Sequence, residues 1–129
     1  MGQLTTGLTG KQHWTVNEAM TAASVGNGLV RAFSTPMLVA LMENAAVAAL
    51  EGTLGDHQTT VGTRVDVRHL AATPVGMEVR AEATLKEIDG RRLVFAVTAW
   101  DGVEKIGEAT HERFIVDRAR FEARLAQKR

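Results

Sequence analysis

The sequence predicts an α+β fold in which one long central helix is wrapped by a strongly curved antiparallel β-sheet. One nearly continuous apolar segment, residues 35–51, has a clear start and stop signal on either side. Four segments of strand-like composition follow it between residues 59 and 116. Asp-Gly pairs at 89–90 and 101–102, which are typical of hairpin turns, separate the last three of these segments. A sheet of this kind can bury the helix by curving around it.

The length and composition indicate one domain covering residues 1–129. The 15 basic and 15 acidic residues balance, which argues against a nucleic-acid or membrane-surface partner. The absence of cysteine excludes a disulfide scaffold, a thiolate nucleophile and cysteine-ligated metal. The N-terminus lacks the basic region and apolar run of a secretory signal, so we expect a cytoplasmic protein.

The segment before the central helix predicts little regular structure. Residues 13–16 have the composition of a short first strand, and residues 18–23 could form a short helix. The Gly-Asn-Gly run at 26–28 then predicts a loop or lid leading into the central helix.

The central helix has recognisable ends. Ser34 or Thr35 can cap its N-terminus with a hydroxyl, and Pro36 suits the first turn because it needs no amide partner there. Gly52 can adopt a positive φ just past the last turn. Apolar residues occupy all faces between these ends, which predicts burial on every side. Glu43 interrupts the apolar run, and a carboxylate in a buried helix is costly unless it is paired or used.

The remainder of the chain reads as β-structure. Residues 77–88 alternate between apolar and polar, as expected of a strand with one face exposed to solvent. Asp117 could cap a short terminal helix that carries Phe121 and Leu125 on one side. We expect a meander of four strands, which cover residues 59–69, 77–88, 92–100 and 105–116. Because such a sheet covers the helix on one side only, burial of the other side predicts a dimer.

Six segments of the chain form one recognisable set: LME at 41–43, VGT at 61–63, HLAATPVG at 69–76, GRRL at 90–93, DGV at 101–103 and IGEATHER at 106–113. Together they resemble the hot-dog-fold thioesterases, and most closely the group that includes fluoroacetyl-coenzyme A thioesterase. The resemblance implies a hot-dog fold, a dimer with sites at the subunit interface, and hydrolysis of acyl-coenzyme A (acyl-CoA) thioesters. Coenzyme A would be part of the substrate, and no cofactor or metal is implied.

By this resemblance the catalytic residues are Thr35, Glu43 and His69. Thr35 would hydrogen-bond the reacting group near the positive end of the helix dipole, where backbone amides could also hold the carbonyl oxygen. Glu43 would attack the thioester carbonyl to give a transient anhydride, or activate a water molecule, and the sequence leaves both routes open. His69 would assist, since a histidine titrates near neutral pH.

The resemblance also implies three substrate-binding residues. Gly62 could simply mark a strand bulge, but the resemblance favours a position that lines the acyl group. Arg113 could pair with a buried carboxylate or bind coenzyme A phosphates. The family's Phe- and Pro-rich lid is replaced by a short segment in which Phe33 is the single aromatic residue. Selectivity for fluoroacetate therefore does not follow from the resemblance, and the acyl group is left open.

The spacing of Thr35 and Glu43 predicts a site shared between two chains. Eight residues of helix rise by ~12 Å, so the two side chains of one protomer cannot both touch one thioester carbon. They can meet if Thr35 of one chain faces Glu43 of its partner in a homodimer, or in a dimer of dimers.

Plainer interpretations and other functions remain open at this stage. Glu43 could be structurally paired, Thr35 could be an ordinary cap, and His69 could be a solvent-exposed residue at a strand end. A hot-dog enoyl-CoA hydratase would need an Asp and a His close together before the helix, and the sequence has no such pair there. A non-catalytic protein that binds or senses an acyl thioester is the alternative from another class.

Overall fold

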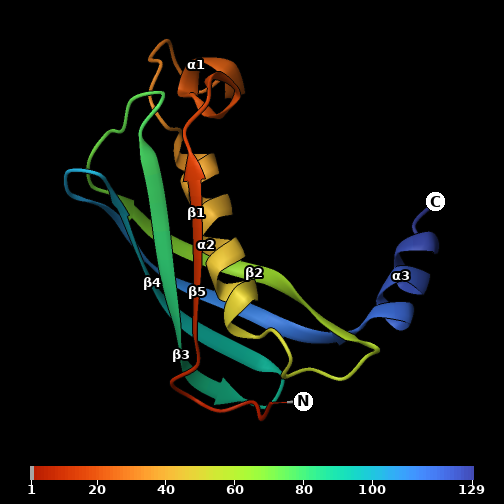
Figure 1. The fold of residues 1–129 in the computed structure, drawn as a ribbon. Coiled ribbons are helices and arrows are strands. Elements are labelled where there is room, and N and C mark those ends of the chain that lie inside the picture. The colour runs from red at the N-terminus through yellow and green to blue at the C-terminus, as the bar shows by residue number, and fades with distance from the viewer. Residues whose placement is uncertain (1) are drawn as a thin grey trace.

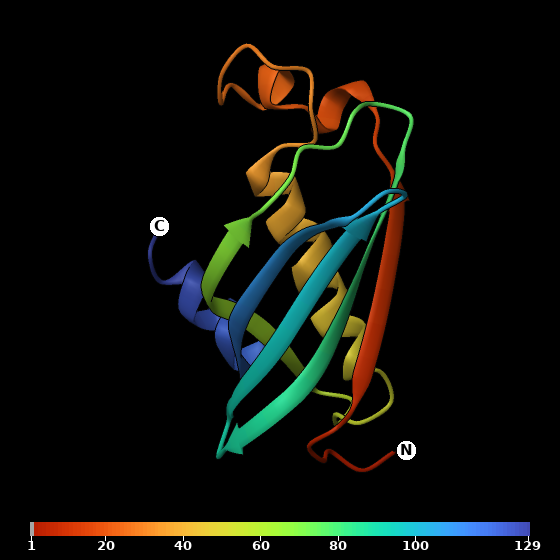
Figure 2. The same cartoon turned by 90° about the vertical axis from the view of Figure 1, so that its left-hand side faces the viewer.

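The computed structural model describes residues 2–129 and shows a five-stranded antiparallel sheet that curves around one long helix (Figures 1 and 2). The strand order in the sheet is β1-β3-β4-β5-β2. This confirms the α+β class. The elements in chain order are β1 (Thr9–Thr15), η1 (a 3₁₀ turn, Glu18–Met20), α1 (Ala22–Val25), α2 (Thr35–Ala49), β2 (Gln58–His69), β3 (Glu78–Asp89), β4 (Arg92–Asp101), β5 (Lys105–Asp117) and α3 (Arg118–Ala126).

Helix α2 is the predicted central helix, but only one of its faces is buried within the chain. The Ser34 hydroxyl caps it by accepting a hydrogen bond from the Met37 amide at 3.3 Å. Asn44 and Val47 on the opposite face are exposed, so the prediction of burial on all sides is wrong for a single chain. The sheet reaches only one side of the helix. The buried residues are Leu38, Leu41, Met42, Ala45, Ala46 and Ala49.

Strand β1 is longer than the predicted segment 13–16 and begins four residues earlier. The reason is Gly10, which lies where β1 crosses α2. A Cβ atom at Gly10 would overlap the backbone of Ala45 and Ala49. The glycine that looks like a loop residue in the sequence is thus required by the close approach of a strand to a helix.

The predicted continuous helix at 18–23 is divided in two. Thr21 lies between η1 and α1, and its hydroxyl caps α1 by accepting from the Ser24 amide at 3.2 Å. This side chain is fully buried. A threonine that caps a helix takes an extended backbone, so it ends the first turn and starts the next.

The four-strand meander is correct for β3, β4 and β5 and wrong for β2. Strand β2 pairs with β5 at the far edge of the sheet, and β3 pairs with β1 instead. The two Asp-Gly turns are tight hairpins, whereas residues 70–77 form a longer connection that passes the start of α2. Within it the Thr73 carbonyl accepts a hydrogen bond from the Phe33 amide at 2.8 Å.

Two further features bear on function. Strand β2 is an edge strand, and none of its residues is fully buried. Helix α3 is capped by Asp117, as predicted, and stands clear of the sheet (Figure 1), so Phe121 and Leu125 remain exposed. Within residues 2–129, no helix combines the length and the apolar character needed to cross a membrane.

Candidate active site

The structure brings Thr35 and His69 together. Thr35 is the first residue of α2 and His69 is the last residue of β2, and their side chains are joined by a hydrogen bond of 2.8 Å between Oγ1 and Nδ1. Partial burial lowers the pKa of His69, while the Ala71 backbone acts in the opposite direction. The ring therefore favours its neutral form, in which Nδ1 accepts from the Thr35 hydroxyl or donates to it according to the tautomer.

One backbone amide is free at the start of α2. Pro36 has no N–H, and the Met37 and Leu38 amides are used by the side chain and the carbonyl of Ser34. Within the described residues, the Thr35 amide has no such acceptor. Of the backbone amides expected to hold a thioester carbonyl, the Thr35 N–H is therefore the one available in this turn of the described chain, and it lies next to the Thr35 hydroxyl.

Glu43 is paired with Arg113. Its Oε2 lies 3.0 Å from Nη1 of Arg113, which is itself held by Thr60 through Nε at 2.9 Å and Nη2 at 3.1 Å. Arg113 is only 6% exposed, whereas the Glu43 side chain is 36% exposed. Of the two predicted roles for Arg113, this geometry favours pairing with the carboxylate. It does not support binding of coenzyme A phosphates, because the guanidinium is buried and occupied.

His111 belongs to the same cluster, and sequence reasoning missed it. Its Nε2 lies 3.2 Å from Nη1 of Arg113 and 3.8 Å from the Glu43 carboxylate, and its Nδ1 lies 2.7 Å from the Arg64 carbonyl. Burial and the neighbouring Arg113 lower the pKa of His111. The signal that could have found it is the period of a strand, since residues two apart on β5 share a face.

The absence of a side chain at Gly62 leaves space for the Glu43 carboxylate. The pairing of β2 with β5 shifts register between Gly62 and Arg64, as the plainer interpretation of Gly62 as a bulge position would require. A Cβ atom at Gly62 would overlap Oε2 of Glu43. The close approach is therefore to the carboxylate, and contact between Gly62 and an acyl group stays a prediction.

Phe33 lies apart from these groups. It is 2% exposed and packs in the core, so its contact with a substrate also stays a prediction. Leu29 and Val30, in the preceding loop, are apolar residues that this segment presents to solvent, with exposed fractions of 94% and 64%.

The predicted site residues thus fall into two separate clusters, which we call half-sites. Thr35 pairs with His69 at the start of α2, and Glu43 pairs with Arg113 and lies against Gly62 two turns further along. The rise of the helix separates them by ~12 Å. Within one chain the Thr, the Glu and the His do not form a single cluster.

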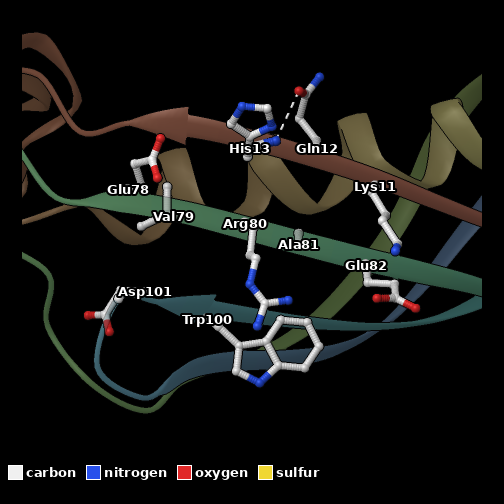
Figure 3. A pocket seen from close by; sticks show the side chains of 11 residues that line it. Lys11, Gln12, His13, Glu78, Val79, Arg80, Ala81, Glu82, Trp100 and Asp101 are labelled. Atoms are coloured by element: carbon white, nitrogen blue, oxygen red, sulfur yellow. Dashed lines mark hydrogen bonds between the residues drawn. The ribbon is translucent and has the colours of Figure 1, made fainter.

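One surface hollow lies away from both half-sites. A hollow of about 280 Å³ lies on the outer face of β1, β3 and β4, where the Arg80 guanidinium lies 4.4 Å above the Trp100 ring (Figure 3). It contains neither half-site. Within residues 2–129, no group of three or more His, Asp or Glu side chains could hold a metal ion. That the reaction needs no metal or cofactor stays a prediction.

Comparison with known proteins gives consistent matches. A family model described as "Fluoroacetyl-CoA-specific thioesterase" matches residues 16–119. The fluoroacetyl-CoA thioesterase of Streptantibioticus cattleyicolor is 43% identical over 96 residues, which are 74% of this chain and 69% of that protein.

Solved structures agree with the sequence matches. The fluoroacetyl-CoA thioesterase FlK superposes with a TM-score of 0.93 at 33% identity, covering 99% of both chains. A thioesterase superfamily member from Thermus thermophilus gives 0.90 at 27% identity, covering 98% of this chain and 94% of that one. A hot-dog-like protein from Thermanaerovibrio acidaminovorans gives 0.86 at 24% identity, with 95% and 91% covered, and supports the fold alone. The hot-dog fold is thereby confirmed.

Proposed function

Because the chain belongs to the family of fluoroacetyl-CoA-specific thioesterases, and is therefore a hydrolase of acyl-CoA thioesters, we propose that it acts on small acyl groups at a site composed of Thr35, His69 and Glu43. The observation that carries the proposal is the pair of half-sites on α2. A hydroxyl paired with a neutral imidazole lies at the helix start, and a carboxylate paired with an arginine lies two turns along.

The half-sites would be completed by a second copy of the chain. The rise of α2 between Thr35 and Glu43 prevents one chain from closing the site. Strand β2 offers a surface for a second chain, because it is an edge strand with unpaired backbone groups and no buried residue. The exposed face of α2, including Val47, would then be covered by the partner helix. A homodimer with two equivalent sites follows, in each of which Thr35 and His69 of one protomer face Glu43 of the other.

Each side chain then has a defined task. The Thr35 amide and hydroxyl would hold the thioester oxygen as it gains negative charge, close to the positive end of α2. His69 would keep the hydroxyl oriented and take part in proton transfer. Oε2 of Glu43 is bound by Arg113, and Oε1 has no hydrogen-bond partner within the described residues. This second oxygen would attack the thioester carbon or remove a proton from water.

A thiol-release assay tests the activity and its residues. Acetyl-, fluoroacetyl-, propionyl- and longer acyl-CoA thioesters would be offered to the wild-type protein and to Glu43→Gln, His69→Ala and Thr35→Ala variants. We expect turnover of at least one short substrate and a loss of kcat in all three variants. Glu51→Gln, at an exposed position just beyond α2, is the matched control. Absence of turnover of every substrate by the wild-type protein would contradict the proposal.

Subunit exchange tests the shared site. Thr35→Ala and Glu43→Ala chains would each be inactive alone. A heterodimer of the two would contain one site with both changes and one site with neither, so mixing should recover activity. If exchange is demonstrated by mass spectrometry and activity stays absent, the site does not combine the two chains.

The route taken by Glu43 can be decided with labelled water. Under single-turnover conditions in ¹⁸O-water, an anhydride opened by attack at the Glu43 carbonyl leaves label in the protein, whereas direct attack of water on the thioester leaves none. Mass spectrometry of the peptide that contains Glu43 detects this label, and its presence supports the anhydride route.

A further inference from the structure

His111 lies beside the Glu43 carboxylate, donates one hydrogen bond and accepts another. The Arg64 carbonyl can only accept, so Nδ1 of His111 carries the hydrogen and donates at 2.7 Å. Nη1 of Arg113 can only donate, so Nε2 of His111 accepts at 3.2 Å. Both partners therefore require the same neutral tautomer of a fully buried ring.

Nη1 of Arg113 is the atom that joins His111 to Glu43. It donates to Oε2 of Glu43 at 3.0 Å and to Nε2 of His111 at 3.2 Å, while Thr60 holds Nε and Nη2. Hydrogen bonds at Nε, Nη1 and Nη2 thus fix the orientation of the guanidinium group. Without an acceptor at His111, Nη1 would lose the partner that sets its direction toward the carboxylate.

We propose that His111 is a positioning residue of the thioesterase site, whose neutral imidazole orients Arg113 so that Arg113 holds Glu43 with one carboxylate oxygen free. The inference rests on the proposed function, since it concerns the same carboxylate. His111 itself has no contact with the Thr35–His69 pair and does not touch the reacting atoms.

Protonation of His111 would break this arrangement. A hydrogen on Nε2 would face the Nη1 donor at 3.2 Å, so two cations would oppose each other. The charged ring would instead compete with Arg113 for Oε2 of Glu43, which lies 3.8 Å away. In either case the Arg113–Glu43 contact is lost.

The surroundings of His111 favour the neutral ring. Burial and Arg113 lower its pKa, while the Arg64 carbonyl on β2, Glu43 on α2 and Glu112 on β5 act in the opposite direction with a smaller effect. From β4 the ring of Phe95 packs beside it, with ring centroids 6.2 Å apart. The site should therefore keep its geometry at neutral pH and lose it only below pH 6.5.

Two substitutions of His111 separate the effect of the hydrogen-bond acceptor at Nε2 from the effect of the ring's volume. His111→Phe fills the space without an acceptor, and His111→Gln places an amide oxygen near the position of Nε2. Exposed His13→Gln is the matched control. Measurements of kcat and KM for an acyl-CoA substrate across pH, with thermal unfolding of each variant, give the readout.

We expect His111→Phe to lower kcat roughly 10- to 150-fold, the scale of one charge-assisted hydrogen bond, with KM little changed. His111→Gln should retain more of kcat and should shift the acidic limb of the kcat profile, because the amide does not titrate. A folded His111→Phe variant with wild-type kcat would overturn the proposal.

Equal losses in the Gln and Phe variants, with an unchanged acidic limb, would also overturn it. If the Phe variant fails to fold, the acidic limb of the Gln variant decides. Failure of the wild-type protein to release thiol is a separate result, since it contradicts the proposed function before any variant is compared.

Discussion

Replacing Gly62 with alanine tests whether the position of the Glu43 carboxylate controls activity. The added Cβ would overlap Oε2 of Glu43 and lie 3.2 Å from Nη1 of Arg113. The carboxylate lies at the end of a flexible and partly exposed side chain, so it can move aside while the backbone stays in place. The substitution should therefore break the 3.0 Å contact between Glu43 and Arg113 without disturbing the sheet.

The size of the effect follows from the interaction that is lost. A hydrogen bond to a charged group contributes about 1.5–3 kcal/mol, which corresponds to roughly 10- to 150-fold in rate if the transition state needs it. The unfolding free energy should fall by no more than about 1–3 kcal/mol, the cost of leaving a buried donor without its partner. Thr60 and His111 still bind Arg113 and limit that cost.

The assay compares kcat for a short acyl-CoA thioester with the melting temperature of the same sample. Gly55→Ala is the control, because its Cβ would make only ordinary contacts of 3.4 Å or more. Glu43→Asp in the Gly62→Ala background shortens the carboxylate and should recover part of kcat. A folded Gly62→Ala protein with wild-type kcat would refute the reasoning, since the carboxylate would then be free to move without consequence.

Three other predictions concern stability. Gly10→Ala should destabilise the fold by more than about 1–3 kcal/mol, because its Cβ meets helix backbone that cannot move aside; thermal unfolding measures this, and a melting temperature equal to wild type would contradict it. Burial lowers the pKa of both His69 and His111 in the folded state, so the unfolded chain binds more protons below pH 6.5. The unfolding free energy should then fall as the pH drops from 6.5 toward those lowered pKa values, by at most about 1.4 kcal/mol per pH unit for each ring. A melting temperature that stays constant from pH 7 to pH 5 would exclude this effect. Asp117→Ala removes the cap of α3 and should raise amide exchange in that helix with kcat unchanged, because α3 contacts neither half-site; exchange as slow as in wild type would count against the cap.

The helix and the hairpins could be predicted from the sequence because their signals are local. Ser34 and Pro36 mark the start of α2 within three residues, and the two Asp-Gly pairs mark turns whose strands are adjacent in the chain. Glu43 stood out for a related reason, since one carboxylate in an apolar helix conflicts with its neighbours. Each of these signals needs no knowledge of distant residues.

The missed features depend on contacts between distant parts of the chain. Gly10 becomes a strand residue only because α2 crosses it. Strand β2 pairs with β5 across sequence separations that run from 38 positions at His69 and Gly107 to 59 positions at Gln58 and Asp117. His111 has no distinguishing neighbour in the sequence. The two-residue period of β5 places it on the same face as Arg113, but its bond to the Arg64 carbonyl depends on the register of β5 against β2, which local patterns do not fix.

The two half-sites explain why a carboxylate is tolerated in the middle of α2. Within one chain Glu43 lies on the margin between the buried and open faces, where Arg113 binds one oxygen and solvent reaches the other. A partner that covers the open face would remove that solvent, and the free oxygen would then need a substrate, a water molecule or a partner side chain. Dimerisation and the use of Glu43 would therefore be linked, because a contact that buried the open face of α2 would also bring a second Thr35–His69 pair to this carboxylate.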